Sequence, residues 1–139
     1  MDRPILLYAP GALPWEDSQS VYHALADLGR EAICLTWPQS PYVSIGFSQT
    51  LSDEVDEDYC QAAGLPIFRR EVGGGTVLLD GDQLFFQLVI RPDHPAVPAR
   101  REAFYRRFLT PAINTYRSLG LAAEHFPIND ICVDRGKIT

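Results

Sequence analysis

Three consecutive glycines, Gly73-Gly74-Gly75, constrain this 139-residue chain more than any other feature. Two arginines, Arg69 and Arg70, precede them, and a short apolar run that ends at Asp80 follows. Because glycine has no side chain, a ligand can lie directly against the backbone of such a loop. Backbone N–H groups can converge there on anionic oxygens, and guanidinium groups can bind the same oxygens in a bidentate manner. The stretch alone also fits a glycine-rich hairpin turn with two solvated arginines, so other segments must decide its role.

Composition narrows the classes of protein to which the chain can belong. The 46% of apolar residues is enough for a globular core, and 18 acidic against 12 basic side chains argue against a nucleic-acid-binding protein. The N-terminal apolar run is too short for a signal peptide, and no run approaches the length of a membrane span. Three widely spaced cysteines, Cys34, Cys60 and Cys132, form no CxxC pair, which argues against a disulfide framework or a zinc site. We therefore expect a cytoplasmic protein that binds neither nucleic acid nor membranes.

Two further segments accompany the glycine block. The segment from Trp37 to Gln49 ends in Gly-x-x-Gln, and the segment from Asn129 to Ile138 begins with Asn-Asp-Ile and contains Gly-Lys-Ile. In this order and at this spacing, the three blocks resemble the lipoate–protein ligase A family of the biotin/lipoate A/B protein ligase superfamily. Three ordered blocks are far more specific than one, and the resemblance runs from about Val21 to the last residue.

The resemblance implies an activity, its cofactors and a partner. Members of this family activate lipoate with ATP, release pyrophosphate and form lipoyl-AMP. A lysine of an acceptor lipoyl-domain protein then receives the lipoyl group. ATP and Mg²⁺ are the implied cofactors, and lipoate is the implied substrate. The implied fold is that of class II aminoacyl-tRNA synthetases and biotin–lipoate ligases.

The resemblance also assigns roles around the glycine block. Arg69 and Arg70 correspond to arginines on the phosphate side of the ligand, and residues 73–75 correspond to the loop along which the acyl-adenylate lies. Val77 and Leu78 correspond to positions whose backbone meets the adenine. The chain departs from the family at Leu79, where many members carry histidine, so the acyl group that it handles stays open between lipoate, octanoate and biotin.

The C-terminal block carries the remaining assigned residues. Asn129 and Asp130 correspond to the polar pair near metal and phosphate, and the carboxylate of Asp130 suits a hard cation such as Mg²⁺. Lys137 corresponds to the lysine that reaches the acyl carbonyl and the α-phosphate, where a compact ammonium group can stabilise developing charge. We expect Lys137 to be the catalytic residue.

Two alternative functions stay open on the same fold. An octanoyl or lipoyl acyltransferase would need a cysteine nucleophile, and Cys132 is the cysteine near the site. Alternation along a strand places Cys132 on the same face as Asp130, with a packed thiol. A non-catalytic lipoate-binding module is the other alternative, because Leu79 departs from the family pattern.

Hydrophobic periodicity and turn residues predict an α/β fold of the α+β type, with a mixed, largely antiparallel sheet and packing helices. We expect residues 76–79 and 84–90 to pair as a hairpin and the second of these strands to be central in its sheet. A helix over residues 99–119 is expected to kink or break at Pro111, and its arginines are expected to be solvated or to contact an acidic partner. The other strands are expected at 4–8, 31–37, 42–47, 66–71, 126–131 and 132–138, and the other helices at 18–28 and from the acidic run at 53–58.

The end of the chain adds one more expectation. The sequence stops at Thr139 within an expected strand, and the family's catalytic domain is longer. We expect residues 1–139 to form a single, incomplete domain whose groove is open on one side. The side chains of Arg70 and Lys137 and the glycine loop should point into that groove, and the chain should self-associate or need a complementing segment.

Overall fold

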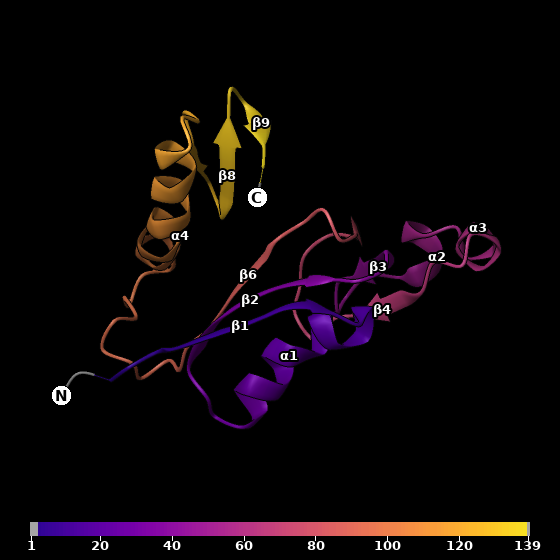
Figure 1. Cartoon of the computed structure of the whole chain (residues 1–139), viewed down its shortest axis with the longest axis horizontal. Coiled ribbons are helices and arrows are strands. Elements are labelled where there is room, and N and C mark those ends of the chain that lie inside the picture. The colour runs from indigo at the N-terminus through magenta and orange to yellow at the C-terminus, as the bar shows by residue number, and fades with distance from the viewer. Residues whose placement is uncertain (1–2, 139) are drawn as a thin grey trace. The chain divides into compact units, whose positions relative to one another are not determined.

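The computed structural model describes residues 3–138. The chain divides into two compact units, residues 1–91 and residues 92–139 (Figure 1). We describe each unit by itself. Among the described residues, no helix combines the length and the apolar character that a membrane crossing requires.

The first sheet of the N-terminal unit has the strand order β1-β2-β6. Strand β1 (Leu6–Leu13) runs parallel to β2 (Ala32–Pro38), and helix α1 (Trp15–Asp27) connects them. Strand β6 (Phe85–Val89) pairs with β2 in the antiparallel sense. Helix α1 ends where its amphipathic pattern predicted, next to Gly29, which adopts a left-handed φ of 62° that glycine tolerates well.

Strand β1 is longer than the sequence pattern predicted. The prediction that a turn closes this strand after Tyr8 is wrong, because the strand continues to Leu13 through a register shift between Tyr8 and Gly11. Gly11 absorbs the irregularity with a φ of 77°, and its carbonyl accepts a hydrogen bond of 2.7 Å from the Thr36 hydroxyl of β2. Pairing with β2 therefore outweighs the local turn signal.

The second sheet of this unit has β3 (Tyr42–Ile45) at its centre. Strand β4 (Ile67–Arg69) lies parallel to β3 on one side, and β5 (Val77–Leu79) lies antiparallel on the other. The short helices α2 (Leu51–Glu54) and α3 (Glu57–Ala62) occupy the connection from β3 to β4. The core here consists of the following buried and partly buried residues: Val43, Ile45, Leu51, Val55, Cys60, Leu65 and Ile67.

The acidic run forms two helices instead of one. Asp56 interrupts the run with an extended backbone, and its carboxylate accepts a hydrogen bond of 2.9 Å from the N–H of Tyr59. It thereby caps α3, as aspartate commonly does at a helix N-terminus. Capping by Asp56 thus decides where α3 begins.

The predicted hairpin between residues 76–79 and 84–90 is wrong. The turn itself forms, with the N–H of Asp82 donating to Oδ1 of Asp80 over 3.0 Å. The strands on either side of it separate, however, because β5 pairs with β3 and β6 pairs with β2. Strand β6 also lies at the end of the described strand order and not at its centre. A local turn sequence fixes the bend of the chain but not the partner of each strand.

The C-terminal unit packs one helix against a three-stranded sheet. Helix α4 (Arg101–Ser118) continues through Pro111 without a break, and β7 (Glu124–Phe126), β8 (Asp130–Val133) and β9 (Gly136–Lys137) form the sheet. Contacts on both sides of the proline hold the helix to a core made of these residues: Leu109, Ala112, Ile113, Tyr116, Ala123, Ile131 and Val133.

The expected strand over residues 126–131 is wrong, because the chain turns at 127–129 between β7 and β8. Within the segment 132–138, the chain turns back between β8 and β9. Asp134 and Arg135 have φ values of 48° and 68°, and both are positive, as tight hairpin turns of the primed type require. Antiparallel pairs predominate over the two parallel ones, so the expected fold class is confirmed. The strands belong to three three-stranded sheets and not to one. The single-domain organisation stays a prediction.

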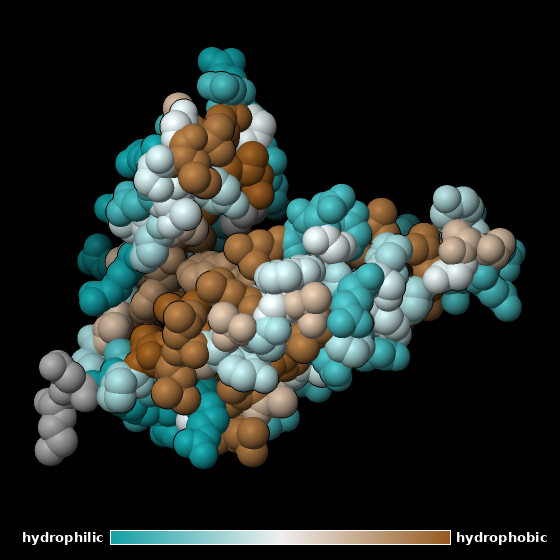
Figure 2. All heavy atoms as spheres, in the orientation of Figure 1, coloured by the Kyte–Doolittle hydropathy of each residue, from teal (hydrophilic) through white to brown (hydrophobic). Residues whose placement is uncertain are grey.

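An apolar surface lies over the first sheet of the N-terminal unit, where Figure 2 shows apolar side chains gathered over β1 and β2. Leu7 of β1 is 70% exposed and Phe86 of β6 is 40% exposed. Contiguous apolar surface of this kind is a common site of association.

We therefore predict that the 139-residue chain self-associates in a concentration-dependent manner, measurable by sedimentation velocity. Replacing Leu7 by serine should weaken that association, because it removes apolar area from the contact surface. The matched control is Leu28→Ser, at the end of α1, which is 73% exposed. A chain that stays monomeric at all concentrations would contradict the prediction.

Candidate functional site

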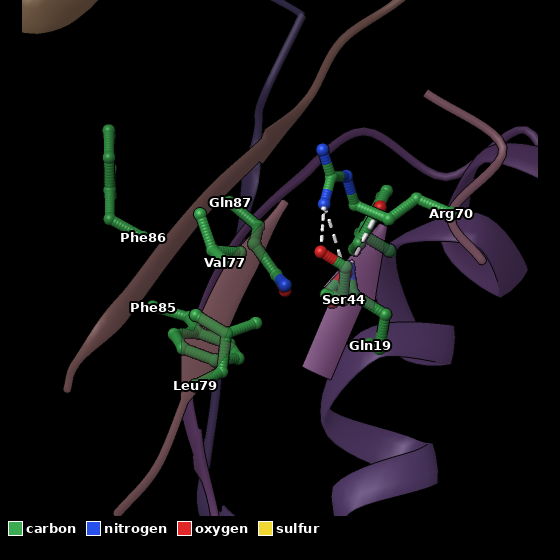
Figure 3. A pocket seen from close by; sticks show the side chains of 9 residues that line it. Gln19, Ser44, Arg70, Val77, Leu79, Phe85, Phe86 and Gln87 are labelled. Carbon is green, nitrogen blue, oxygen red and sulfur yellow. Dashed lines mark hydrogen bonds between the residues drawn. The ribbon is translucent and has the colours of Figure 1, made fainter. Parts of the chain in front are cut away.

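A pocket of ≈ 330 Å³ lies in the N-terminal unit. One side is formed by β5 and β6 and is apolar except for Gln87, whereas the other side is polar and is formed by α1, β3 and Arg70 (Figure 3). The apolar lining residues are Val77, Leu79, Phe85 and Phe86. The polar lining residues are Gln19, Tyr22, Ser44, Arg70 and Gln87. A pocket of this kind suits a ligand with a hydrocarbon part and an anionic or polar part.

A buried hydrogen-bond network shapes the polar side. Oε1 of Gln19 accepts from the Tyr42 hydroxyl over 2.9 Å and from the Ser44 hydroxyl over 3.2 Å. Nε2 of Gln19 donates to the Tyr22 hydroxyl over 2.9 Å. Burial raises the pKa of Tyr22 and of Tyr42, so both hydroxyls stay protonated and uncharged at neutral pH. Arg70 is a charged group next to this network. The pattern of apolar residues predicts the helix that carries Gln19 and Tyr22, but it gives neither residue a role.

Arg70 connects this network to the glycine loop. Its Nη1 donates to the carbonyl and the hydroxyl of Ser44 over 3.0 and 3.1 Å. Its Nη2 donates to the carbonyls of Gly73 and Gly75 over 3.2 and 2.8 Å. Arg70 therefore lines the pocket and also holds the glycine loop in one conformation.

All three carbonyls of the glycine loop point back into the protein. Those of Gly73 and Gly75 point to Arg70, and that of Gly74 lies against Gly46, where a Cβ atom would collide with it. Because a trans peptide directs its C=O and N–H in opposite directions, the N–H groups of Gly74 and Thr76 point away from Arg70, and that of Gly75 points away from Gly46. Such a row of outward N–H groups can bind anionic oxygens.

Arg69 holds the loop that follows β3. Its Nη1 donates to the carbonyls of Gly46, Phe47 and Gln49 over 3.0, 3.1 and 2.7 Å. The Arg69 guanidinium thus fixes the loop that follows β3. A phosphate contact by Arg69 stays a prediction, and any such contact would have to come from its remaining donors.

The residues after the glycine loop contribute to the apolar wall. Val77 and Leu79 line the pocket, whereas Leu78 alternates away from it and is 55% exposed. Leu79 stands where many family members carry histidine, so this wall is more apolar than a histidine would make it. The adenine contacts expected of the Val77 and Leu78 backbone stay a prediction.

The C-terminal unit carries the second group of expected site residues. Nζ of Lys137 and Oδ1 of Asp130 form an ion pair of 2.9 Å between neighbouring strands of one sheet. Asn129 is exposed in the turn that precedes β8. The approach of these residues to the glycine loop stays a prediction.

Few side chains near Asp130 could act as metal ligands. Among residues 3–138, no group of three or more His, Cys, Asp or Glu side chains could hold a metal ion. Mg²⁺ commonly binds through one or two carboxylates together with substrate phosphates and water. One carboxylate, Asp130, with the neighbouring Asn129 fits that pattern only when a nucleotide supplies phosphate oxygens.

Cys132 is buried on β8, with 8% of its surface exposed. Its thiol is packed, as the sequence predicted, and a packed thiol is poorly placed to attack a bulky acyl carrier.

Residues 11–139 match the family model of the lipoyl protein ligase A/B catalytic domain. The chain belongs to this family. It is 29% identical over 139 residues to lipoate-protein ligase A subunit 1 of Thermoplasma acidophilum, covering 99% of this chain and 51% of the relative. It is 34% identical over 82 residues to octanoyltransferase LipM of Macrococcus caseolyticus, covering 59% of this chain and 29% of that relative. The chain thus spans about half the length of the T. acidophilum relative.

Solved structures show the same fold. A bipartite lipoate protein ligase from T. acidophilum, studied with its E2 lipoyl domain, superimposes with a TM-score of 0.80 at 23% identity, covering 98% of this chain and 53% of that one. A lipoate-protein ligase A bound with ATP gives a TM-score of 0.79 at 26% identity, covering 98% and 59%. The family resemblance and the expected fold are therefore confirmed.

The three glycines should respond differently to alanine. Gly74 has a φ of 107°, and a Cβ there would lie 3.0 Å from Nη2 of Arg70, whereas a Cβ at Gly73 or Gly75 meets nothing within 4 Å. We predict that Gly74→Ala lowers the free energy of unfolding by roughly 1–2 kcal/mol, as expected for a residue strained at positive φ. Gly73→Ala and Gly75→Ala should leave it nearly unchanged in urea titrations. Equal losses in all three variants would show that the loop conformation differs from the one described.

Proposed function

We propose that the protein acts in ATP-dependent lipoate–protein ligation, forming lipoyl-AMP and passing the lipoyl group to a lysine of an acceptor lipoyl domain. The observation that carries the proposal is that Arg70 lines a pocket with one apolar wall and also holds the glycine loop. A lipoyl-adenylate has a hydrocarbon chain next to a phosphate, and the pocket offers surfaces of these two kinds side by side. Membership of the lipoyl ligase family supports the same reading.

The apolar wall would take the acyl chain. Leu79, Phe85 and Val77 present hydrocarbon surface on one side of the pocket. Each methylene group of the acyl chain that is buried there would contribute at most roughly 0.8 kcal/mol to the binding free energy, and such a chain has about eight methylene-sized groups. The N–H groups of Gly74 and Gly75 would then face the carboxylate or the phosphate that forms from it. Such donors stabilise the charge that develops as the carboxylate attacks the α-phosphate.

The C-terminal unit would supply the cation. The Lys137 ammonium would approach the reacting carbonyl and the α-phosphate, and Asn129 and Asp130 would hold Mg²⁺ through the phosphates of ATP. The metal would neutralise phosphate charge and orient the leaving pyrophosphate. Asp130 already pairs with Lys137, so the carboxylate also fixes where the ammonium stands before substrate arrives.

The acceptor, the cytoplasmic location and the assembly are part of the proposal. The T. acidophilum neighbour is described as bipartite and was studied with its E2 lipoyl domain, which supports a lipoyl-domain acceptor and a complementing polypeptide here. Seven of the chain's 12 basic side chains and only five of its 18 acidic ones lie in residues 92–139. Arg100, Arg101 and Arg107 are exposed there, which suits contact with an acidic acceptor surface.

The deciding experiment is lipoate-dependent exchange of labelled pyrophosphate into ATP, measured with the complete natural protein and any complementing polypeptide. Exchange that requires lipoate and Mg²⁺ is the expected result. Exchange without lipoate, or none while octanoyl groups move from a carrier protein, would favour the alternative acyltransferase. The 34% sequence identity with octanoyltransferase LipM over 82 residues is the reason for testing that alternative. Binding of lipoate without either reaction would indicate the non-catalytic module.

Lys137→Ala should lower the rate of that exchange by a factor of about 100 or more, because one charge-stabilising contact in the transition state is typically worth this much. The melting temperature should change little, since Lys137 is 63% exposed on the terminal strand β9. Arg135→Ala, in the adjacent turn, is the matched control. Exchange at the wild-type rate in Lys137→Ala would remove this lysine from the mechanism.

A further inference from the structure

The glycine loop contacts a second loop that follows β3, here called the Gly46–Gln49 loop and defined as residues 46–49. Gly46 is buried, and the carbonyl of Gly74 lies so close to its Cα that any side chain at position 46 would collide with it. The N–H of Phe47 donates to the carbonyl of Val72 over 3.0 Å. The orientation of the Gly74 peptide, and with it the outward direction of the Gly75 N–H, therefore depends on where Gly46 stands.

Gln49 determines where Gly46 stands. Its Oε1 accepts from the N–H of Gly46 over 2.7 Å and lies 3.1 Å from the Thr76 hydroxyl. One amide oxygen thus connects Gly46, the first residue of the Gly46–Gln49 loop, to Thr76, the residue that follows the glycine loop. Among the residues that the structure describes, Nε2 of Gln49 has no hydrogen-bond partner. Only the acceptor side of the amide is used.

Neighbouring groups favour this arrangement. Arg69 holds the carbonyls of Gly46, Phe47 and Gln49 with a single nitrogen, which closes the Gly46–Gln49 loop around the Arg69 guanidinium. Oε2 of Glu54 lies 3.2 Å from the same Thr76 hydroxyl, so this hydroxyl has acceptors on two sides. The hydrogen bonds of Arg69, Gln49 and Thr76 thus hold the two loops together, and a ligand-binding loop needs such supporting contacts to keep its geometry.

We propose that Gln49 is a positioning residue, whose amide oxygen sets the glycine-loop N–H groups for anion binding by holding Gly46 against the Gly74 carbonyl. Gln49 lines no part of the pocket and touches the ligand only through the loop that it supports. Arg69 belongs to the same support. The identity of the ligand, a nucleotide or an acyl-adenylate, rests on the proposed function.

Because only the amide oxygen of Gln49 accepts hydrogen bonds here, variants that keep or remove this acceptor test the proposal. Gln49→Glu keeps an oxygen at this position and should preserve the support. Gln49→Met has nearly the same shape but no acceptor of comparable strength, and it leaves the Gly46 N–H without its partner. An unmet buried donor is costly enough to change the loop geometry or population. The matched control is Gln61→Met, an exposed position on α3.

Two measurements on the complete chain test the proposal. The first is the ¹H–¹⁵N spectrum of the ligand-free protein, in which Gln49→Met should shift the amide resonances of Gly46, Gly74 and Gly75, while Gln49→Glu and Gln61→Met leave those of Gly74 and Gly75 close to wild type. The second is calorimetric titration with Mg-ATP, in which Gln49→Met should weaken binding by about tenfold, corresponding to roughly 1.4 kcal/mol, and Gln61→Met should leave it unchanged.

The outcomes separate this inference from the proposed function. If wild-type protein binds no ATP, the proposed function fails, and the spectra alone decide the role of Gln49. If Gln49→Met shows wild-type resonances for Gly74 and Gly75, the inference is overturned whatever the affinity. If Gln49→Glu shifts the amide resonances of Gly74 and Gly75 as far as Gln49→Met does, the acceptor oxygen is not what matters, and the inference is overturned as well.

Discussion

The site depends first on the hydrogen bonds of one guanidinium group. Arg70 donates to Ser44 on β3 and to two carbonyls of the glycine loop, and charged donors make stronger hydrogen bonds than neutral ones. Glycine loses more conformational freedom on folding than any other residue, so a loop of three glycines has little reason to keep one conformation by itself. Arg70 supplies that reason, and by drawing carbonyls inward it turns N–H groups outward. The N–H groups of Gly74 and Thr76 then face away from Arg70, so the guanidinium holds the loop from one side and leaves N–H dipoles available on the other.

The arginines next to the glycines are visible in the sequence. The residues that hold the glycine loop and shape the polar side of the pocket are harder to recognise there. The glycine block predicted an anion-binding loop, and Leu79 marked a change in the pocket wall. Gln19 could not be identified in this way, because its importance comes from a contact with Tyr42 that only the folded chain brings about. Gly46 stands in the Gly-x-x-Gln motif, but its contact with Gly74 is visible only in the structure. Gln49 stood in a quoted motif, but a motif does not say which atom of the amide is used. The sequence therefore points to the glycine loop more readily than to the residues that hold it.

The same distinction applies to the fold. Periodicity placed α1, β2 and α4 closely, because each buries one face or stripe and the pattern of apolar residues reports that burial. Strand pairing was harder to predict. The Asp80–Asp82 turn forms, yet β5 and β6 belong to different sheets, and so the pocket has a wall from each of them. Had these strands formed the hairpin that the turn favoured, Leu79 and Phe85 would belong to one ribbon. The separation of the strands thus helps to form the apolar side of the site.

In the proposed mechanism, Asp130 has two partners that compete for its charge. The ion pair with Lys137 keeps the ammonium in place, but a carboxylate beside an ammonium also reduces the field that the ammonium exerts on a phosphate. Mg²⁺ bound to a nucleotide would draw Asp130 oxygens toward itself, since hard cations prefer carboxylate ligands. The Lys137 ammonium would then face the reacting phosphate with less of its charge compensated. Arrival of the metal–nucleotide complex would in this way increase the electrostatic effect of Lys137 at the moment when negative charge develops.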